Sequence, residues 1–256
     1  MAKNVPLETR MKSYEKKIRL TERLPVILRI DGRAFHTFTR GLEKPFDNRI
    51  IKMMNKVGIE LCKEIQNCRM AYIQSDEISF LIKQRREAEP WFGNELQKIC
   101  SVSAGLASSV ATQFTIKNIP EKQPTVMFDA RAFVIPPSEV VNYFIWRQRD
   151  WERNSLQMLA RKYYSYKKLH NEKGPELHEM IFKAGDNWND LPVSLRRGRA
   201  CIKKIKKIHV ENEHFTGDVE RPKWVIDNNI PMFTKDRNYV SSLLSTSSSS
   251  SPSSLI

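Results

Sequence analysis

Apolar and polar positions along this chain follow a pattern that predicts a sheet covered by helices. Short apolar runs rich in β-branched residues, typical of buried strands, occur at residues 26–30, 70–74, 78–82 and 125–134. Apolar residues recur every three or four positions from Phe46 to Gln66 and from Glu95 to Phe114, as on one face of a helix. The predicted order is strand, helix, two strands, helix, strand.

This order is that of the split βαβ, ferredoxin-like βαββαβ arrangement, so the expected fold class is α+β. In it the first strand lies beside the hairpin strand that carries Asp76. Residues 11–23 have helical spacing and predict a short lead-in helix that Pro25 ends, and a long helix is expected from Ser138 to Tyr163.

Three regions follow from the composition along the chain. Residues 1–136 form the predicted core, and residues 137–240 a helical and basic extension with a small β/α part. Residues 241–256 are rich in serine, and we expect them to be disordered.

Carboxylates stand where two predicted strands end. The run 26–30 leads directly into Asp31, and the turn of the predicted hairpin contains Asp76 and Glu77. Neighbouring carboxylates repel each other unless a cation lies between them, and Mg²⁺ binds through one or two carboxylates together with substrate phosphates. This predicts a two-metal site for phosphoryl or nucleotidyl transfer. The alternative is that both aspartates only cap turns.

The segment after Asp31 has the features of a phosphate-binding turn. Backbone N–H groups from Gly32 to Phe38 are free to face phosphates, and Arg33 and Lys44 are close in sequence to neutralise them. For His36 the choice is between a packed residue and a ligand contact. For Asp47 it is between an N-cap of the following helix and a nucleotide contact.

Composition points to a polyanionic partner. The chain has 256 residues, with 43 Lys and Arg against 29 Asp and Glu, which gives a formal charge of +14. A cluster of seven basic residues without an acid predicts a nucleic-acid surface rather than a merely solvated hairpin: Arg196, Arg197, Arg199, Lys203, Lys204, Lys206 and Lys207.

Cysteine spacing and hydropathy bear on the compartment. The four cysteines form no C-x-x-C pair, which favours reduced thiols in an intracellular protein. No segment approaches the roughly twenty apolar residues of a membrane span. We expect a cytoplasmic protein without a membrane partner.

Several sequence blocks, in this order, resemble the tRNA-histidine guanylyltransferase family. They are Arg29-Ile30-Asp31-Gly32-Arg33-x-Phe35-His36-x-Phe38, Lys44-Pro45-x-Asp47, Gln74-Ser75-Asp76-Glu77-Ile78-Ser79-Phe80, Phe128-Asp129-Ala130-Arg131 and Trp146-Arg147-Gln148-x-Asp150. The resemblance implies a polymerase-type palm that adds nucleotides to tRNA in the 3′-to-5′ direction. It also implies a homotetramer.

The resemblance further implies roles for individual residues. Two Mg²⁺ ions would be held by Asp31, the Gly32 carbonyl and Asp76, with Glu77 as a third candidate catalytic residue. ATP, and GTP or another nucleoside triphosphate, would be bound by Asp31, Gly32, Arg33, Ala34, Phe35, His36, Lys44, Asp47, Ser75 and Asp76. Arg131 and Arg147 join the basic cluster as candidate tRNA contacts, although either could meet triphosphate instead.

One block departs from the family pattern. Where eukaryotic members have His-Ile-Asn-Asn-Leu-Tyr-Asn, this chain has Glu152-Arg153-Asn154-Ser155-Leu156-Gln157-Met158. This resembles the Thg1-like branch, so the hypothesis is template-dependent repair of tRNA 5′ ends. The alternatives are untemplated guanylate addition to tRNA-histidine, a palm-type nucleotide cyclase and a non-catalytic tRNA-binding protein.

Overall fold

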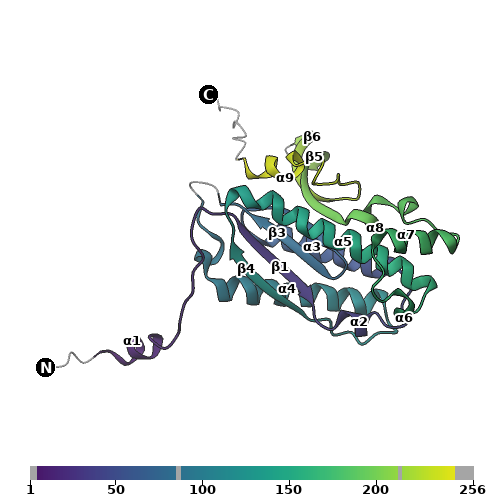
Figure 1. Cartoon of the computed structure of the whole chain (residues 1–256). Helices are drawn as coiled ribbons and strands as arrows, with labels where there is room; N and C mark the ends of the chain where they lie inside the picture. The colour runs from purple at the N-terminus through teal and green to yellow at the C-terminus, as the bar shows by residue number, and fades with distance from the viewer. Residues whose placement is uncertain (1–4, 85–87, 213–214, 246–256) are drawn as a thin grey trace.

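The computed structural model describes residues 5–84, 88–212 and 215–245. Its strands form one antiparallel sheet of order β4-β1-β3-β2-β5-β6 (Figure 1). The strands are β1 (Val26–Gly32), β2 (Cys68–Gln74), β3 (Glu77–Ile82), β4 (Phe128–Val134), β5 (Arg199–Asn212) and β6 (Phe215–Asp227). The order of the first four strands is that of the ferredoxin-like palm, which confirms the predicted α+β class.

Helices precede, connect and follow these strands. They are α1 (Leu7–Lys12), α2 (Phe35–Phe38), α3 (Asn48–Glu64), α4 (Leu96–Asn118), α5 (Val140–Tyr163), α6 (Tyr166–Leu169), α7 (Gly174–Lys183), α8 (Val193–Arg197) and α9 (Asn238–Ser241). Short 3₁₀ turns are η1 (Trp91–Asn94), η2 (Pro137–Glu139), η3 (Trp188–Asp190) and η4 (Ser242–Leu244).

The sheet is buried on both faces. Leu28 and Ile30 of β1 pack with α3 and α4, whereas the preceding Ile27 packs on the other face with Tyr72 and with Phe144 of α5. This alternation follows from the two-residue period of a strand. Two apolar cores therefore hold the palm, one under α3 and α4 and one under α5.

Helix α4 corrects the prediction that no segment has the apolar content of a membrane span. Among the described residues it is the one helix that passes by length and composition, with a mean hydropathy of 1.3. Its Ile99, Ala107 and Ala111 are buried against the sheet, and its Ser108 hydroxyl accepts a hydrogen bond from the Phe128 N–H. Its apolar content thus serves the core under the sheet.

The two ends of the described chain differ from prediction. The lead-in helix is α1, not residues 11–23, because Ile18 to Leu20 pair in extended form with the segment before α4: the Leu20 N–H donates to the Asn94 carbonyl at 2.9 Å. At the other end, Leu243 and Leu244 pack against the α5 core. The predicted disorder from residue 241 is therefore wrong up to residue 245, and residues 246–256 lie outside the described part.

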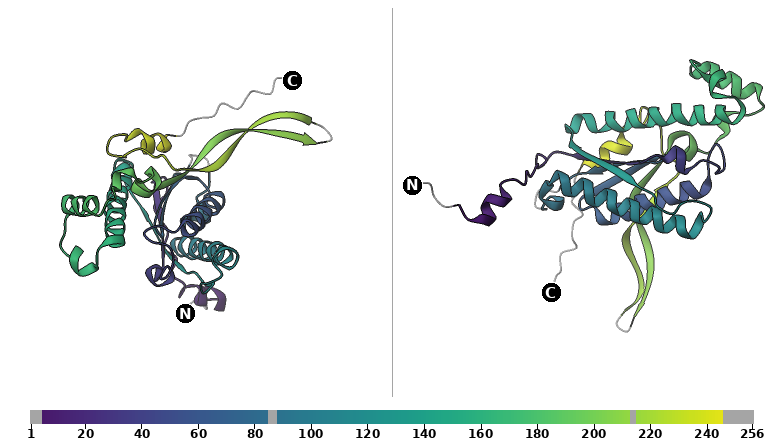
Figure 2. Two further views of the ribbon diagram at one scale, coloured as in Figure 1. Left: turned by 90° about the vertical axis from the view of Figure 1, so that its right-hand side faces the viewer. Right: turned by 90° about the horizontal axis from the view of Figure 1, so that it is seen from below.

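The basic extension continues the palm sheet. β5 pairs with β2 over Arg199 to Ile202, and beyond that its ladder partner is β6 alone. Figure 2 shows the resulting hairpin projecting from the body. The predicted boundary at residue 136 stays a prediction, since the sheet is continuous across the two regions.

Candidate active site

Strand pairing brings the predicted acids to one edge of the palm. Asp31 lies opposite Glu77 of β3 and opposite Asp129 of β4. The Gly32 N–H donates to the Asp76 carbonyl at 3.1 Å, so the β2–β3 turn lies against the end of β1. Asp31 and Asp76 are half-buried there.

Electrostatics at this edge favour a bound cation. Burial, against the lowering effect of a hydrogen bond from Ser75, and the charge of Asp31 together raise the pKa of Asp76 to about 6. Burial and the charge of Asp129 also raise the pKa of Asp31, against the lowering effect of Arg131. A cation relieves both the burial of charge and the repulsion.

The chemistry of these donors fits Mg²⁺. Two carboxylates beside a cavity are the kind of ligand set that this hard ion uses together with phosphates and water. Within the described ranges, no group of three or more His, Cys, Asp or Glu residues could hold a metal by itself. The remaining ligands would therefore have to come from backbone, substrate or water.

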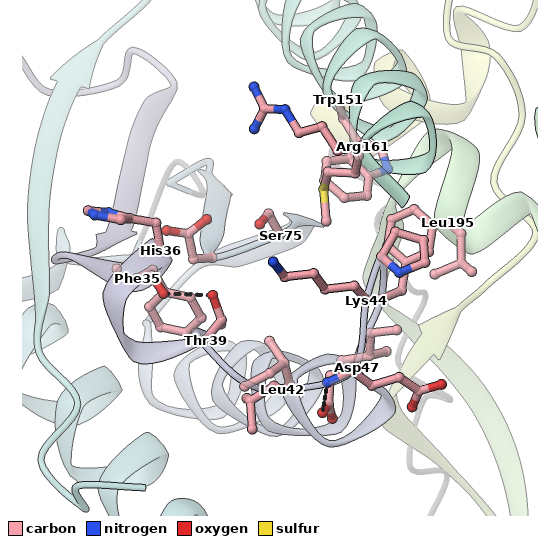
Figure 3. A pocket seen from close by; sticks show the side chains of 18 of the residues that line it. Phe35, His36, Thr39, Leu42, Lys44, Asp47, Ser75, Trp151, Arg161 and Leu195 are labelled. Atoms are coloured by element: carbon pink, nitrogen blue, oxygen red, sulfur yellow. Dashed lines mark hydrogen bonds between the residues drawn. The ribbon is translucent and has the colours of Figure 1, made fainter. Parts of the chain in front are cut away.

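The edge opens into a cavity of about 580 Å³, a size typical of ligand pockets (Figure 3). Eight of the predicted nucleotide-binding residues line it: Gly32, Ala34, Phe35, His36, Lys44, Asp47, Ser75 and Asp76. Asp31 and Arg33 are not part of the lining. The exposed Arg33 contributes a backbone N–H to the Met127 carbonyl at 2.9 Å.

The turn after β1 needs a glycine at its start. A Cβ on Gly32 would lie 2.3 Å from the ring of the buried Phe35, so no other residue fits without moving that ring. Ala34 then takes a left-handed φ of 53° and α2 begins. His36 is exposed, with its Nε2 3.1 Å from the Thr37 hydroxyl, which places it at the rim rather than in the core.

Two residues of opposite charge in the cavity wall, Asp47 and Lys44, differ in whether they have a partner. The Asp47 carboxylate caps α3 and accepts from the Arg49 backbone and guanidinium, which lowers its pKa to about 2. The capping interpretation of Asp47 is therefore confirmed. Lys44 reaches into the cavity toward Ser75 (Figure 3) and makes no ion pair with any described residue. Its charge is available to a ligand.

Relatives that match most of this chain identify its family. A family model described as tRNAHis guanylyltransferase matches residues 8–136. A probable tRNA(His) guanylyltransferase of Dictyostelium discoideum is 30% identical over 221 residues, which cover 76% of this chain and 81% of the relative. The chain belongs to the tRNA(His) guanylyltransferase family.

Solved structures agree with this assignment. A bacterial tRNA(His) guanylyltransferase (Thg1)-like protein in complex with ATP is 38% identical with a TM-score of 0.84, covering 94% of this chain and 99% of that protein. A yeast tRNA(His) guanylyltransferase, 23% identical with a TM-score of 0.66, shares the fold. The guanylyltransferases are nucleotidyltransferases, so the chain is an enzyme of that class. This excludes the cyclase and the non-catalytic binder.

In this guanylyltransferase-family palm, Glu77 is buried rather than part of the cavity lining. Its carboxylate accepts from the Arg147 guanidinium at 2.8 and 2.9 Å and from the Gln74 amide at 3.0 Å. Burial raises its pKa, and the charges of Arg147 and Arg29 oppose the rise. Because Glu77 lies opposite Asp31, this ion pair positions the strand end that carries the acid.

Two of the predicted tRNA contacts are corrected by burial. Arg147 is 7% exposed, lies under the Trp146 ring at 4.4 Å and pairs with Glu77 and Asp150. Arg199 is 2% exposed and lines the cavity. Neither presents a charge to the outer surface, because Arg147 lies on the side of α5 that faces Glu77 of the sheet and Arg199 is enclosed where β5 pairs with β2.

The other basic candidates remain accessible. Arg131 is exposed beside Asp129, and Arg196 and Arg197 are half-buried at the end of α8. Lys203, Lys204, Lys206 and Lys207 are exposed on β5. The strand register adds two basic residues that the sequence reasoning missed, Lys223 and Arg221. They lie opposite Lys204 and Lys206, respectively. Like charges directly opposite repel, which favours an anionic partner on this hairpin.

The sequence reasoning also missed half of the cavity wall. Trp151, Met158, Arg161 and Lys162 of α5 and Leu195 of α8 line it. Figure 3 shows Trp151 and Arg161 on the helix facing the Lys44 side. Their helical spacing in the sequence marks a face of α5, but only the tertiary packing brings that face over the palm.

Proposed function

We propose that this enzyme adds nucleotides to the 5′ end of tRNA in the 3′-to-5′ direction, directed by the opposing strand, and so repairs truncated 5′ ends. The observation that carries the proposal is the cavity itself. It is lined by the Asp76 carboxylate, which lies beside that of Asp31 at the palm edge, by residues of the turn after β1 and by Lys44, which has no ion-pair partner among the described residues.

Relatives supply the nucleotide class. The bacterial Thg1-like proteins that resemble this chain at 38% identity were solved with ATP and with GTP. We infer that the cavity holds a nucleoside triphosphate, with its phosphates toward Ser75 and Lys44 and its base toward the apolar wall of α2 and α5. The exposed β5–β6 hairpin would bind the tRNA backbone.

The proposed chemistry has two displacements. A 5′-phosphate oxygen of the tRNA attacks the α-phosphorus of ATP, and pyrophosphate leaves. The 3′-hydroxyl of the incoming nucleotide then attacks the activated 5′-phosphorus, and AMP leaves. Lys44 neutralises phosphate charge in both displacements, while Asp31 and Asp76 hold the reacting groups at the palm edge.

Mg²⁺ held by Asp31, Gly32 and Asp76 would lower the pKa of the attacking hydroxyl and stabilise charge on phosphoryl oxygens. The Glu77–Arg147 pair keeps β3 in register beside Asp31. Glu77 is therefore proposed as a positioning residue.

The deciding experiment uses 5′-phosphorylated tRNA that lacks its first nucleotide. The purified protein is incubated with it, Mg²⁺, ATP and one nucleoside triphosphate at a time, for four different opposing bases. Templated repair predicts that only the complementary nucleotide extends each tRNA. Addition of guanylate whatever the opposing base would instead establish the alternative, untemplated guanylate addition, and no extension at all would refute both.

A further inference from the structure

Arg199 is a buried charged residue of the cavity wall. It is 2% exposed and lines the cavity. It stands at the first position of β5, at the root of the hairpin whose outer lysines face solvent. A guanidinium keeps its charge at neutral pH even here, because burial lowers its pKa only to about 10.

The positive charge of Arg199 has few partners within the protein. Its Nε donates to the Asn55 side-chain oxygen at 2.7 Å, and no described carboxylate lies within ion-pair distance of it. Arg147, the other buried arginine, has both Glu77 and Asp150. A buried charge without a partner is unfavourable, so the site is completed by an anion from outside.

The backbone holds Arg199 in place before any ligand arrives. Gly198 has φ +81°, and a Cβ there would lie 2.8 Å from the Ile73 carbonyl oxygen. The Tyr72 hydroxyl donates to the Arg197 carbonyl at 2.7 Å. The close approach at Gly198 and this hydrogen bond hold the start of β5 against β2, so the sheet fixes the backbone of Arg199, and the hydrogen bond to Asn55 orients its guanidinium.

Strand register puts Arg199 near the β2–β3 turn. It lies opposite Ile73 of β2, and Ser75 comes two residues after Ile73, in the turn that follows β2, roughly 7 Å from Ile73 along the chain. Lys44 reaches toward Ser75 from the other wall (Figure 3). In the described lining, Asp47 is paired with Arg49 and Lys162 with Asp186. The charges that are left are two carboxylates, Glu43 and Asp76, against the three cations Lys44, Arg161 and Arg199, a surplus of one positive charge.

We propose that Arg199 is the buried anion-binding residue of this pocket and that it binds the polyphosphate of a free nucleoside triphosphate. A planar guanidinium matches phosphate oxygens with two parallel N–H donors. This inference rests on the proposed function for what the pocket holds, and it moves Arg199 from the tRNA surface to the nucleotide.

The test is a titration of ATP, ADP, AMP and adenosine into the full chain by calorimetry. Arg199→Met should weaken ATP binding about 10- to 100-fold and leave adenosine binding unchanged. Arg199→Lys, which keeps the charge but loses the planar fork, should fall between Arg199→Met and the unaltered protein. Arg153→Met, at an exposed arginine of α5, is the matched control and should bind every ligand normally.

A melting curve without nucleotide separates binding from folding. Arg199→Met should melt no lower than the unaltered protein, because it removes an uncompensated buried charge. If it does not fold, Arg199→Lys still carries the test. Equal loss of ATP and adenosine, or no loss of either, overturns the inference.

A third arm separates free nucleotide from tRNA. If Arg199→Met weakens binding of 5′-phosphorylated tRNA relative to 5′-hydroxyl tRNA and spares ATP, the residue serves the RNA end and the inference is wrong. Lys44→Met separates the role inferred for Arg199 from the proposed function of the pocket. Weaker ATP binding in Lys44→Met with normal binding in Arg199→Met overturns only this inference, whereas no ATP binding by the unaltered protein refutes the proposed function.

Discussion

The palm edge and the β5–β6 hairpin use the same charged residue types in opposite ways. At the palm edge Asp31, Asp76 and the Glu77–Arg147 pair are buried or half-buried, each in its own environment. On the hairpin the lysines are exposed, and Lys204 even faces Lys223. A charge at the palm edge therefore has one position and one role, whereas hairpin charges act together and replace one another.

Substitution of Asp31 or Asp76 is the strongest test of the difference between the palm edge and the hairpin. Asp76→Ala and Asp31→Ala should each reduce nucleotide addition by about 10³-fold or more, because charge on the phosphates loses its stabilisation. Binding of tRNA, measured by filter retention, should persist.

The matched control is Asp129→Ala, since Asp129 shares the register row with Asp31 but is exposed beside Arg131. It should retain most of the activity. An equal loss in all three variants would mean that the edge tolerates no charge change and that Asp31 and Asp76 have no special role.

The buried ion pair should dominate stability. Arg147→Ala leaves Glu77 buried without its partner, which should lower the free energy of unfolding by about 3–5 kcal/mol in urea denaturation. Arg153→Ala removes an exposed partner of Asp150 and should change it by less than about 0.5 kcal/mol. Similar values for both would show that burial of Arg147 adds nothing.

A smaller effect, with a pH signature, is expected at Asp47. Its pKa is lowered to about 2 by hydrogen bonds from Arg49. The ionised form therefore stabilises the fold above the unfolded pKa of about 4, and this contribution is lost as the pH falls toward 2. Asp47→Ala should lower stability by about 1–2 kcal/mol at pH 7.

Thermal melting of Asp47→Ala between pH 2 and 7 checks the sign. The difference from the unaltered protein should shrink as the pH drops below about 4. A difference that stays constant across this range would contradict the role of the carboxylate charge.

Hairpin lysines should show the smallest single effects. Lys204→Gln and Lys206→Gln should each reduce the slope of log tRNA affinity against log salt by about 1, additively, and leave ATP affinity unchanged. Lys63→Gln, at an exposed position of α3, is the control. A single hairpin substitution that abolishes tRNA binding would break the distinction between the two regions.

The sequence predicted the meeting of Asp31 and Asp76 because strand ends and hairpin turns are local signals and the βαββαβ order has one common topology. It mispredicted Arg147 and Arg199. Basic residues in a basic chain look alike, and only the packing of α5 and the pairing of β5 with β2 decide which ones are buried.

The prediction of a lead-in helix at residues 11–23 was wrong for a related reason. Tyr14 and Ile18 have helical spacing, but hydrogen bonds to the segment before α4 hold Ile18 and Leu20 extended. Tertiary contacts thus override a short periodic pattern, whereas the longer patterns of α3 and α4 survive.

Strand β5 runs from the palm edge into the hairpin and sets a fixed distance between them. Arg199 in the pocket and Lys207 on the outer hairpin belong to one unbroken strand, eight residues or roughly 27 Å apart. This spacing is set by covalent geometry, so a polyanion held along the lysines meets the pocket at a constant offset. A pair of residues inserted into β5 and its partner strand would lengthen that offset without altering either end.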